Sequence, residues 1–222
     1  MNKYDVIIIG AGPSGIFCAY ELMRQKPDMK VLMIEKGRSI EKRQCPKRTT
    51  KVCVGCKPCS ITTGFAGAGA FSDGKLSLSP DVGGTLPEIL GYEKAEELIK
   101  EADNIYLKFG ADEKVYGIDD YEAIERIRAK AIRANLKLIE CPIRHLGTEE
   151  GYKIYTRLQE HLLASGVEIK FMTMVQDIII EDGVAKGVVT DKEETYYADE
   201  IVSGIGREGS SWFEGICKNH GI

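Results

Sequence analysis

The sequence has little that would place it in a membrane or on a nucleic acid. Its longest apolar runs are far shorter than the roughly 20 residues that a membrane-spanning helix needs. Its 30 basic and 34 acidic side chains give a net charge of −4, so no basic excess attracts a nucleic acid or an anionic lipid surface. No internal repeat and no low-complexity tract is present. These absences favour a globular protein with neither a nucleic-acid nor a membrane partner.

We also expect no signal peptide, because a predicted strand begins at about Tyr4. Seven cysteines are present, and four of them fall between Cys45 and Cys59. That clustering suits a reducing compartment better than a disulfide framework. We therefore expect a cytoplasmic protein of one large domain or two small ones.

The N-terminal stretch has the pattern of a nucleotide-binding strand–helix–strand unit. Val6–Ile9 is a continuous β-branched run, typical of a strand that is buried on both faces of a parallel sheet. A G-x-G-x-x-G spacing follows at once, and a helix is expected from Ser14 to about Gln25. In this spacing the first glycine permits a tight turn, the second lets the backbone approach a pyrophosphate, and the third lets the helix lie close to the strand. The three glycines are Gly10, Gly12 and Gly15.

The ligand expected at this unit is a dinucleotide with a free 2′-hydroxyl group. The helix N-terminus presents unpaired N–H groups and the positive end of its dipole to the phosphates. A second apolar run, Lys30–Ile34, leads into Glu35, which lies 20 residues after Gly15. An acidic side chain at that distance accepts hydrogen bonds from a ribose, and it would repel a 2′-phosphate. NADP is therefore disfavoured.

A cationic, irregular segment over residues 37–63 carries the clustered cysteines. Its last three cysteines read C-x-x-C-x-x-C, and thiolates at this spacing can converge on an iron–sulfur cluster or a zinc ion. The fit to a ferredoxin pattern is incomplete, because the Cys-Pro pair lies upstream of the run and not after it. Three alternatives stay open, namely a metal site, redox-active thiols without metal, and ordinary loop cysteines. The candidate metal ligands are Cys45, Cys53, Cys56 and Cys59.

A glycine-rich segment, Gly64–Leu78, follows the cysteines. Small residues at this density let a backbone pass close to a flat or phosphorylated ligand, which favours a cofactor-lining loop over a flexible surface loop. No catalytic residue can be assigned. The polar candidates are Asp73 and Lys75 on this segment and, after a strand predicted at Leu136–Ile139, the neighbours Arg144 and His145.

The remaining pattern predicts the fold class. Helices are expected at residues 92–109, 121–135, 148–165 and 210–218, and a parallel strand at 167–171. A hairpin is expected at 175–181 and 184–190, with a short third strand at 194–197 and a return to the parallel sheet at 200–203. The prediction is an α/β fold, a Rossmann-like parallel sheet with a β-meander, in one domain over residues 1–222. Residues 39–135 form an inserted segment of loops and helices within it.

This order of elements resembles the glutathione-reductase-like FAD-binding domain. More narrowly, the chain resembles the "FAD-dependent dehydrogenase" family of bacteria and archaea. The resemblance is carried by Cys-x-x-Cys-Lys-Pro-Cys-Ser (53–60), Gly-Ala-Gly-Ala-Phe-Ser-Asp-Gly-Lys-Leu (67–76), Pro-Ile-Arg-His-Leu-Gly-Thr (142–148) and Gly-Arg-Glu-Gly-Ser (206–210).

The resemblance implies an FAD-dependent oxidoreductase that transfers hydride between an unknown small-molecule substrate and the flavin, with electrons leaving to a second acceptor. It implies that Val175 offers its backbone to the adenine, that Gly204 lies beside the ribityl–phosphate region, and that Arg43 holds the cofactor. The loop 67–69 would line the flavin. The residues expected at the cofactor are Gly10, Gly12, Pro13, Ser14, Gly15, Glu35, Lys36, Arg43, Gly67, Ala68, Gly69, Val175 and Gly204.

The sequence departs from the pattern of such flavoproteins after Gly206. The later Gly-Asp segment and the substrate-domain half are missing, so the chain resembles the N-terminal portion of a longer flavoprotein. Two alternatives remain. One is an NAD-binding enzyme similar to thiazole synthases or ribose-1,5-bisphosphate isomerases. The other is a non-catalytic cofactor- or metal-binding subunit that needs a partner chain.

Overall fold

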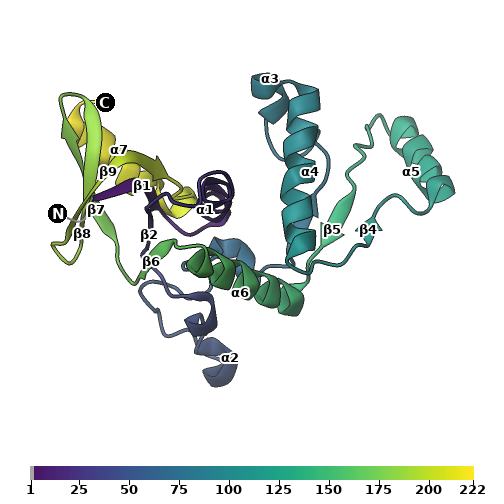
Figure 1. Ribbon diagram of the computed structural model, residues 1–222. Coiled ribbons are helices and arrows are strands. Elements are labelled where there is room, and N and C mark those ends of the chain that lie inside the picture. Colours follow the sequence, from purple (N-terminus) through teal and green to yellow (C-terminus); the bar gives the residue numbers. More distant parts are fainter. Residues whose placement is uncertain (1–2) are drawn as a thin grey trace. The chain divides into compact units, whose positions relative to one another are not determined.

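The computed structural model describes residues 3–222, which divide into two compact units (Figure 1). The first comprises the chain up to Ala70 and from Tyr155 onward, and the second comprises Phe71–Ile154. In the first unit lie β1 (Lys3–Ile9), α1 (Pro13–Gln25), β2 (Val31–Glu35), η1 (Ile40–Lys42), α2 (Lys47–Thr50), β6 (Glu168–Phe171), β7 (Val175–Glu181), β8 (Val184–Thr190), β9 (Thr195–Ser203), η3 (Arg207–Gly209) and α7 (Ser210–His220). In the second lie β3 (Lys75–Ser77), α3 (Leu86–Leu90), α4 (Tyr92–Lys108), β4 (Val115–Tyr116), α5 (Tyr121–Arg133) and β5 (Ile143–His145). The short η2 (Gly67–Phe71) and the helix α6 (Thr148–Ala164) each begin in one unit and end in the other.

The first unit is built on a six-stranded sheet in the order β6-β2-β1-β9-β8-β7. The strands β6, β2, β1 and β9 are parallel, whereas β7, β8 and β9 form an antiparallel meander. This arrangement confirms the predicted α/β class. One detail of the prediction is wrong, because the third meander strand and the returning parallel strand are a single strand, β9. Its first three residues, Thr195–Tyr197, pair with β8, and Tyr197–Ser203 pair with β1.

Both faces of the central strands are covered. Ile7 and Ile9 of β1 belong to a buried cluster that also contains Ile216 of α7. Ile8, between them, is fully buried on the other face, where its side chain lies against Gly15 of α1. Successive residues of a strand point to opposite faces, so a strand buried on both sides needs an unbroken apolar run. Val6–Ile9 supplies that run.

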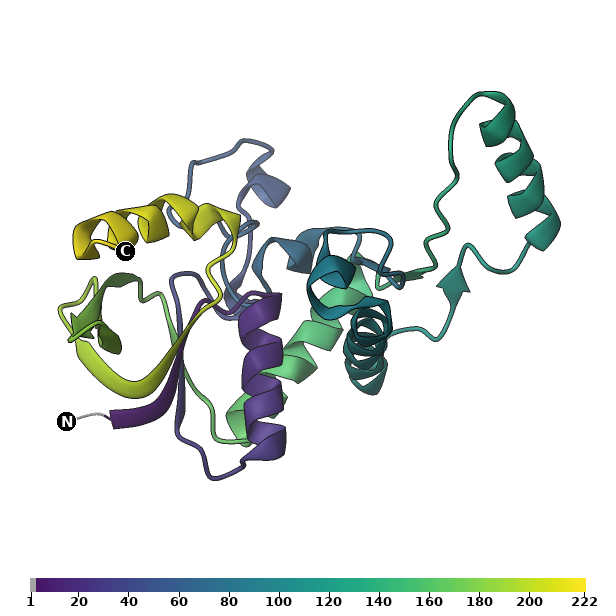
Figure 2. The same ribbon diagram turned by 90° about the horizontal axis from the view of Figure 1, so that it is seen from above.

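The last helix is tied to the edge of the meander. The Nε1 atom of Trp212 donates a hydrogen bond to the carbonyl oxygen of Gln176 at 3.0 Å, and His220 contacts Asp177 at 3.0 Å. Figure 2 shows α7 running alongside the meander strands. The helix α7 is therefore held to β7 near both of its ends.

The second unit contains a small antiparallel sheet in the order β3-β5-β4. Arg144, on its middle strand, is buried, and its guanidinium donates to both carboxylate oxygens of Asp103 on α4. The strand predicted at Leu136–Ile139 is wrong, since that stretch is irregular and Leu136 is 67% exposed. The strand forms farther on, at β5, where β3 and β4 supply pairing partners.

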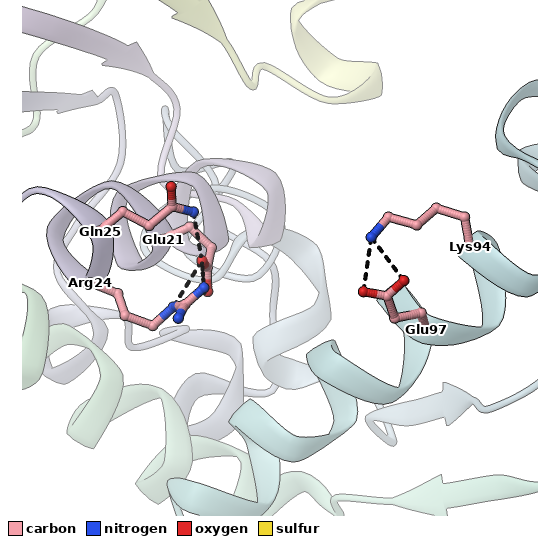
Figure 3. Close-up of polar contacts among 5 residues, drawn as sticks. All are labelled: Glu21, Arg24, Gln25, Lys94 and Glu97. Atoms are coloured by element: carbon pink, nitrogen blue, oxygen red, sulfur yellow. Dashed lines mark hydrogen bonds and ion pairs between the residues drawn. The ribbon is translucent and has the colours of Figure 1, made fainter.

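The exposed sides of the helices carry ion pairs that stay within one helix (Figure 3). On α1, Glu21 accepts hydrogen bonds from Arg24 and Gln25, and on α4 Lys94 pairs with Glu97. Spacings of three or four residues place these side chains on one helix face, where such pairs contribute only a few tenths of a kcal/mol. Within residues 3–222, no helix is long and apolar enough to cross a lipid bilayer.

Candidate functional site

A cavity of about 500 Å³ lies in the first unit, at the carboxyl ends of β1, β2 and β9. Its walls come from the start of α1, the loop 62–68, residues 173–175 and the segment 204–212. The volume falls within the range of small-molecule sites, and open parallel sheets bind ligands outside the carboxyl ends of their strands. The cavity therefore has both the place and the size of a nucleotide site.

The three motif glycines have different physical roles. A Cβ atom on Gly15 would lie 2.0 Å from the carbonyl oxygen of Gly10, so only glycine lets α1 approach the turn. Gly10 has a φ of +98°, and a Cβ there would lie 2.8 Å from the carbonyl oxygen of Gly204. The space beside Gly12 is open, because the nearest atom would be 4.0 Å away. Gly15 and Gly10 thus serve chain packing, whereas Gly12 leaves room for a ligand.

The start of α1 is suited to a negatively charged ligand. Pro13 occupies the first turn, and Gly12 at the N-cap supplies no side-chain hydrogen bond to the helix. No acidic side chain lies in this turn. The backbone donors and the positive end of the helix dipole are left for an anion such as a phosphate.

Glu35 is held rigidly at the end of β2. It is 6% exposed, and its two carboxylate oxygens accept hydrogen bonds from the backbone N–H groups of Ala11 and Gly37, each at 2.8 Å. A carboxylate oxygen can accept more than one hydrogen bond, so both oxygens retain capacity for a hydroxyl group. Because Glu35 lines the cavity, it can bind a ribose as the sequence predicts.

The glycine-rich segment lies against the nucleotide-binding turn. The N–H of Ala66 donates to the carbonyl oxygen of Ala11 at 2.8 Å, and a Cβ on Gly67 would lie 3.5 Å from the Cα of Gly12. Gly67 and Ala68 line the cavity. The segment therefore forms a wall of this cavity.

Arg43 supports this loop from behind. Its buried guanidinium donates hydrogen bonds to the carbonyl oxygens of Ser60, Ile61, Phe65 and Gly67. Burial lowers the pKa of Arg43 to about 10, so the group stays charged at neutral pH. The structure thus gives Arg43 the task of holding the loop, and it does not line the cavity.

Lys36, Thr63 and Glu208 form a polar cluster on the cavity wall, which we call the clasp. The Lys36 ammonium lies 2.8 Å from one carboxylate oxygen of Glu208, and the Thr63 hydroxyl donates to the other at 2.7 Å. These two partners hold the pKa of Glu208 below its usual range. Sequence reasoning missed Thr63 and Glu208, because nothing in their local pattern reveals a partner so far along the chain.

The structure brings most of the predicted cofactor residues together. Those that line the cavity are Gly10, Gly12, Pro13, Ser14, Glu35, Lys36, Gly67, Ala68, Val175 and Gly204. Gly15, Arg43 and Gly69 are not among the lining residues, and the first two support the site through packing and hydrogen bonds. The lining residues that the sequence did not single out include Thr62, Thr63, Thr173, Arg207, Glu208 and Trp212.

The metal site that the cysteine spacing left open finds no support. Within residues 3–222, no three His, Cys, Asp or Glu side chains lie close enough to hold a metal ion. All four candidate cysteines are free, with Cys45 half-buried and Cys53, Cys56 and Cys59 exposed. The Cys59 sulfur is instead engaged by hydrogen bonds from the backbone of Thr62 and Ile61 and from the Thr62 hydroxyl, which lower the pKa of the thiol. The iron–sulfur or zinc interpretation is therefore set aside.

The polar residues that the sequence offers as catalytic candidates all lie in the second unit, where they contact other residues of that unit. Arg144 is engaged by Asp103, as described above, and also donates to the carbonyl oxygen of Asp112. The ring of His145 lies edge-on to Tyr116, and Lys75 pairs with Asp73 at 3.4 Å on the surface. None of these contacts indicates a catalytic role.

Comparison with known proteins identifies the family. The chain matches the FAD dependent oxidoreductase (DAO) family over residues 5–209, and it belongs to that family. A short stretch of 33 residues, 15% of this chain and 10% of the other, is 52% identical to thiamine thiazole synthase from Coprinopsis cinerea.

Several solved structures share the fold. L-Amino acid deaminase from Proteus vulgaris has a TM-score of 0.56 at 14% identity, over 100% of this chain and 51% of that one. Glycine oxidase from Bacillus cereus has a TM-score of 0.54 at 18% identity, over 97% and 58%. THI4 from Thermovibrio ammonificans has a TM-score of 0.53 at 13% identity, over 99% and 64%. The chain therefore spans between about half and two thirds of the length of these structures.

Proposed function

We propose that this chain is the FAD-binding portion of an oxidoreductase that moves hydride between a small-molecule substrate and the flavin. The observation that carries the proposal is the cavity where the open approach beside Gly12, the start of α1 and the fixed carboxylate of Glu35 meet. Family membership supplies the identity of the dinucleotide. The four sequence segments quoted above favour, within this family, the dehydrogenases of bacteria and archaea, which pass electrons to a second acceptor. The clustered cysteines favour a cytoplasmic location.

In this proposal each wall of the cavity has a task. The backbone at Gly12 and Ser14 binds the pyrophosphate, and Glu35 accepts hydrogen bonds from the hydroxyl groups of the adenosine ribose. Val175 offers its backbone to the adenine, and Gly204 lies beside the ribityl–phosphate region. When bound, the flavin supplies the hydride chemistry, and the residues described here bind and orient it. Arg43 acts indirectly, by fixing the loop that carries Gly67.

A second candidate function is supported by one pair of observations. The 33-residue match to a thiamine thiazole synthase and the shared fold with THI4 favour an NAD-binding enzyme of thiazole-synthase type. The same cavity would then hold the adenosine half of NAD, since both dinucleotides present a pyrophosphate and an unmodified ribose. The two candidates differ in the nucleotide that the protein retains.

The test is an absorption spectrum of the whole chain, purified without oxygen, followed by identification of the nucleotide released on denaturation. The proposal predicts flavin bands near roughly 370 and 450 nm, and FAD in the released fraction. A colourless protein that releases NAD, and that binds added NAD but not added FAD, would replace it with the second candidate. Binding of neither dinucleotide would overturn both.

A further inference from the structure

Four charged residues line the cavity, and three of them are engaged within the protein. Glu35 accepts hydrogen bonds from two backbone N–H groups, and Lys36 and Glu208 pair with each other in the clasp. Arg207 is the fourth. No hydrogen bond or ion pair of its side chain is formed in the part of the chain that the structure describes, residues 3–222. A cation thus remains available on the wall of a proposed anion site.

The backbone that carries Arg207 is firmly placed. Gly206, with a φ of +62°, turns the chain out of β9 into η3, and Gly209 packs so closely that a Cβ there would lie 2.6 Å from the Cβ of Ile205. The next residue, Glu208, is held by the clasp at two points. Three residues before Arg207, the carbonyl of Gly204 lies against the nucleotide-binding turn at Gly10. Arg207 is therefore presented from a fixed turn next to the proposed pyrophosphate site.

The position of Arg207 decides the net charge of the cavity. The ammonium of Lys36 offsets the carboxylate of Glu208, so Glu35 and Arg207 are the charges that remain. Without Arg207, the cavity would present a net negative charge to a pyrophosphate that itself carries negative charge. The backbone donors at the start of α1 contribute only partial charges. A guanidinium is the side chain best suited to pair with phosphate oxygens, since it donates two parallel hydrogen bonds.

We propose that Arg207 is a phosphate-binding residue of this cavity and pairs with the pyrophosphate of the bound dinucleotide. The inference rests on the proposed function, and it adds a recognition residue outside the G-x-G-x-x-G motif. The cavity should therefore prefer a phosphorylated ligand to the nucleoside alone, because Arg207 pairs with phosphate charge and not with the adenine or the ribose.

The experiment measures the affinity of the whole chain for FAD, ADP and adenosine by calorimetric titration at two salt concentrations. The variants are Arg207→Gln and Arg207→Lys, and the matched control is Arg133→Gln, an exposed arginine of α5 that does not line the cavity. We expect Arg207→Gln to weaken binding of FAD and ADP about tenfold, leave adenosine within about twofold, and reduce the salt dependence. Arg207→Lys should recover part of the affinity, and Arg133→Gln should match the wild type.

The outcomes separate this inference from the function on which it rests. If the wild type binds FAD and ADP and Arg207→Gln binds each of them with the wild-type affinity, the role proposed for Arg207 is wrong and the proposed function stands. An equal loss for adenosine and ADP would also overturn the inference, since it would indicate a change in cavity shape. If the wild type binds neither FAD nor ADP, the proposed function fails and the inference fails with it.

Discussion

Lys36 and Glu208 are 172 residues apart in the sequence, yet the Nζ atom of one lies 2.8 Å from the Oε1 atom of the other. Their side chains are 34% and 53% exposed, so the pair adds little to global stability. Its importance is local. Together with Thr63, it joins the end of β2, the loop 62–68 and η3 on one wall of the cavity. The clasp therefore links three segments that line the proposed dinucleotide cavity.

Acid should weaken this clasp. The native pKa of Glu208 is lowered by Lys36 and Thr63, so its stabilising contribution is present above the unfolded pKa of about 4.3. The contribution is lost as the pH falls through the depressed native pKa. Between pH 6 and pH 3, the wild type should lose slightly more stability than Glu208→Gln, by less than about 1 kcal/mol. Denaturant unfolding of both proteins across this range is the measurement, and identical pH profiles would contradict the expectation.

The two motif glycines Gly12 and Gly15 should respond differently to alanine. Gly15→Ala places a methyl group against the Gly10 carbonyl, and we expect it to destabilise the fold by about 3 kcal/mol or more. Gly12→Ala meets only open space, so stability should change by less than about 1 kcal/mol while affinity for FAD falls at least about tenfold. Thermal unfolding and FAD titration of both variants test the pair. A folded Gly12→Ala variant with unchanged affinity would show that no ligand approaches there.

We expect Arg43 to be needed for the structure of the loop whose carbonyl groups it binds. Arg43→Met leaves four backbone carbonyls without their charged donor, and we expect a loss of about 2–4 kcal/mol in unfolding free energy. Limited proteolysis should then cleave near residues 59–67. Arg38→Met, at an exposed neighbouring position, serves as the control and should behave as the wild type. Resistance of Arg43→Met to both denaturant and protease would exclude the holding role.

The Cys59 thiol should be more reactive than its two exposed neighbours. Hydrogen bonds from Thr62 and Ile61 lower the pKa of Cys59, and the thiolate is the reactive form. Alkylation near pH 7, followed by peptide mapping, should modify Cys59 several-fold faster than Cys53 and Cys56. Thr62→Val removes one of the hydrogen bonds and should slow the reaction and shift its pH profile upward. Equal rates at all three cysteines would mean that these hydrogen bonds do not stabilise the thiolate.

The sequence could predict those parts of the structure that depend on local pattern. The apolar run Val6–Ile9, the glycine spacing and Glu35 together define the strand, the turn and the acidic position, because each depends on residues within a few positions. The helices α4, α5, α6 and α7 begin at the predicted residues, where helical periodicity starts. The strand prediction at 136–139 is wrong because apolar residues alone do not determine a strand, which also needs a pairing partner.

The parts of the structure that the sequence could not predict depend on contacts between segments that are far apart in the chain. The sequence implied cofactor contact for Arg43, but its guanidinium is engaged by carbonyls 17–24 residues further on. The cysteine spacing allowed a metal site, yet spacing alone cannot show whether the fold brings the thiols together. The pairing of Lys36 with Glu208 and the availability of Arg207 follow from the path of η3 back to the cavity. No periodic pattern of apolar residues in the sequence indicates that path.

The most direct test of the account is whether the cavity at the ends of β1, β2 and β9 binds the adenosine diphosphate half of FAD. Calorimetric titration of the whole chain, freed of bound nucleotide, with FAD, ADP and FMN answers this. We predict that FAD and ADP bind in competition with each other and that FMN, which lacks the adenosine half, binds far more weakly. FMN binding as tight as that of FAD, or the absence of binding by both FAD and ADP, would contradict the account.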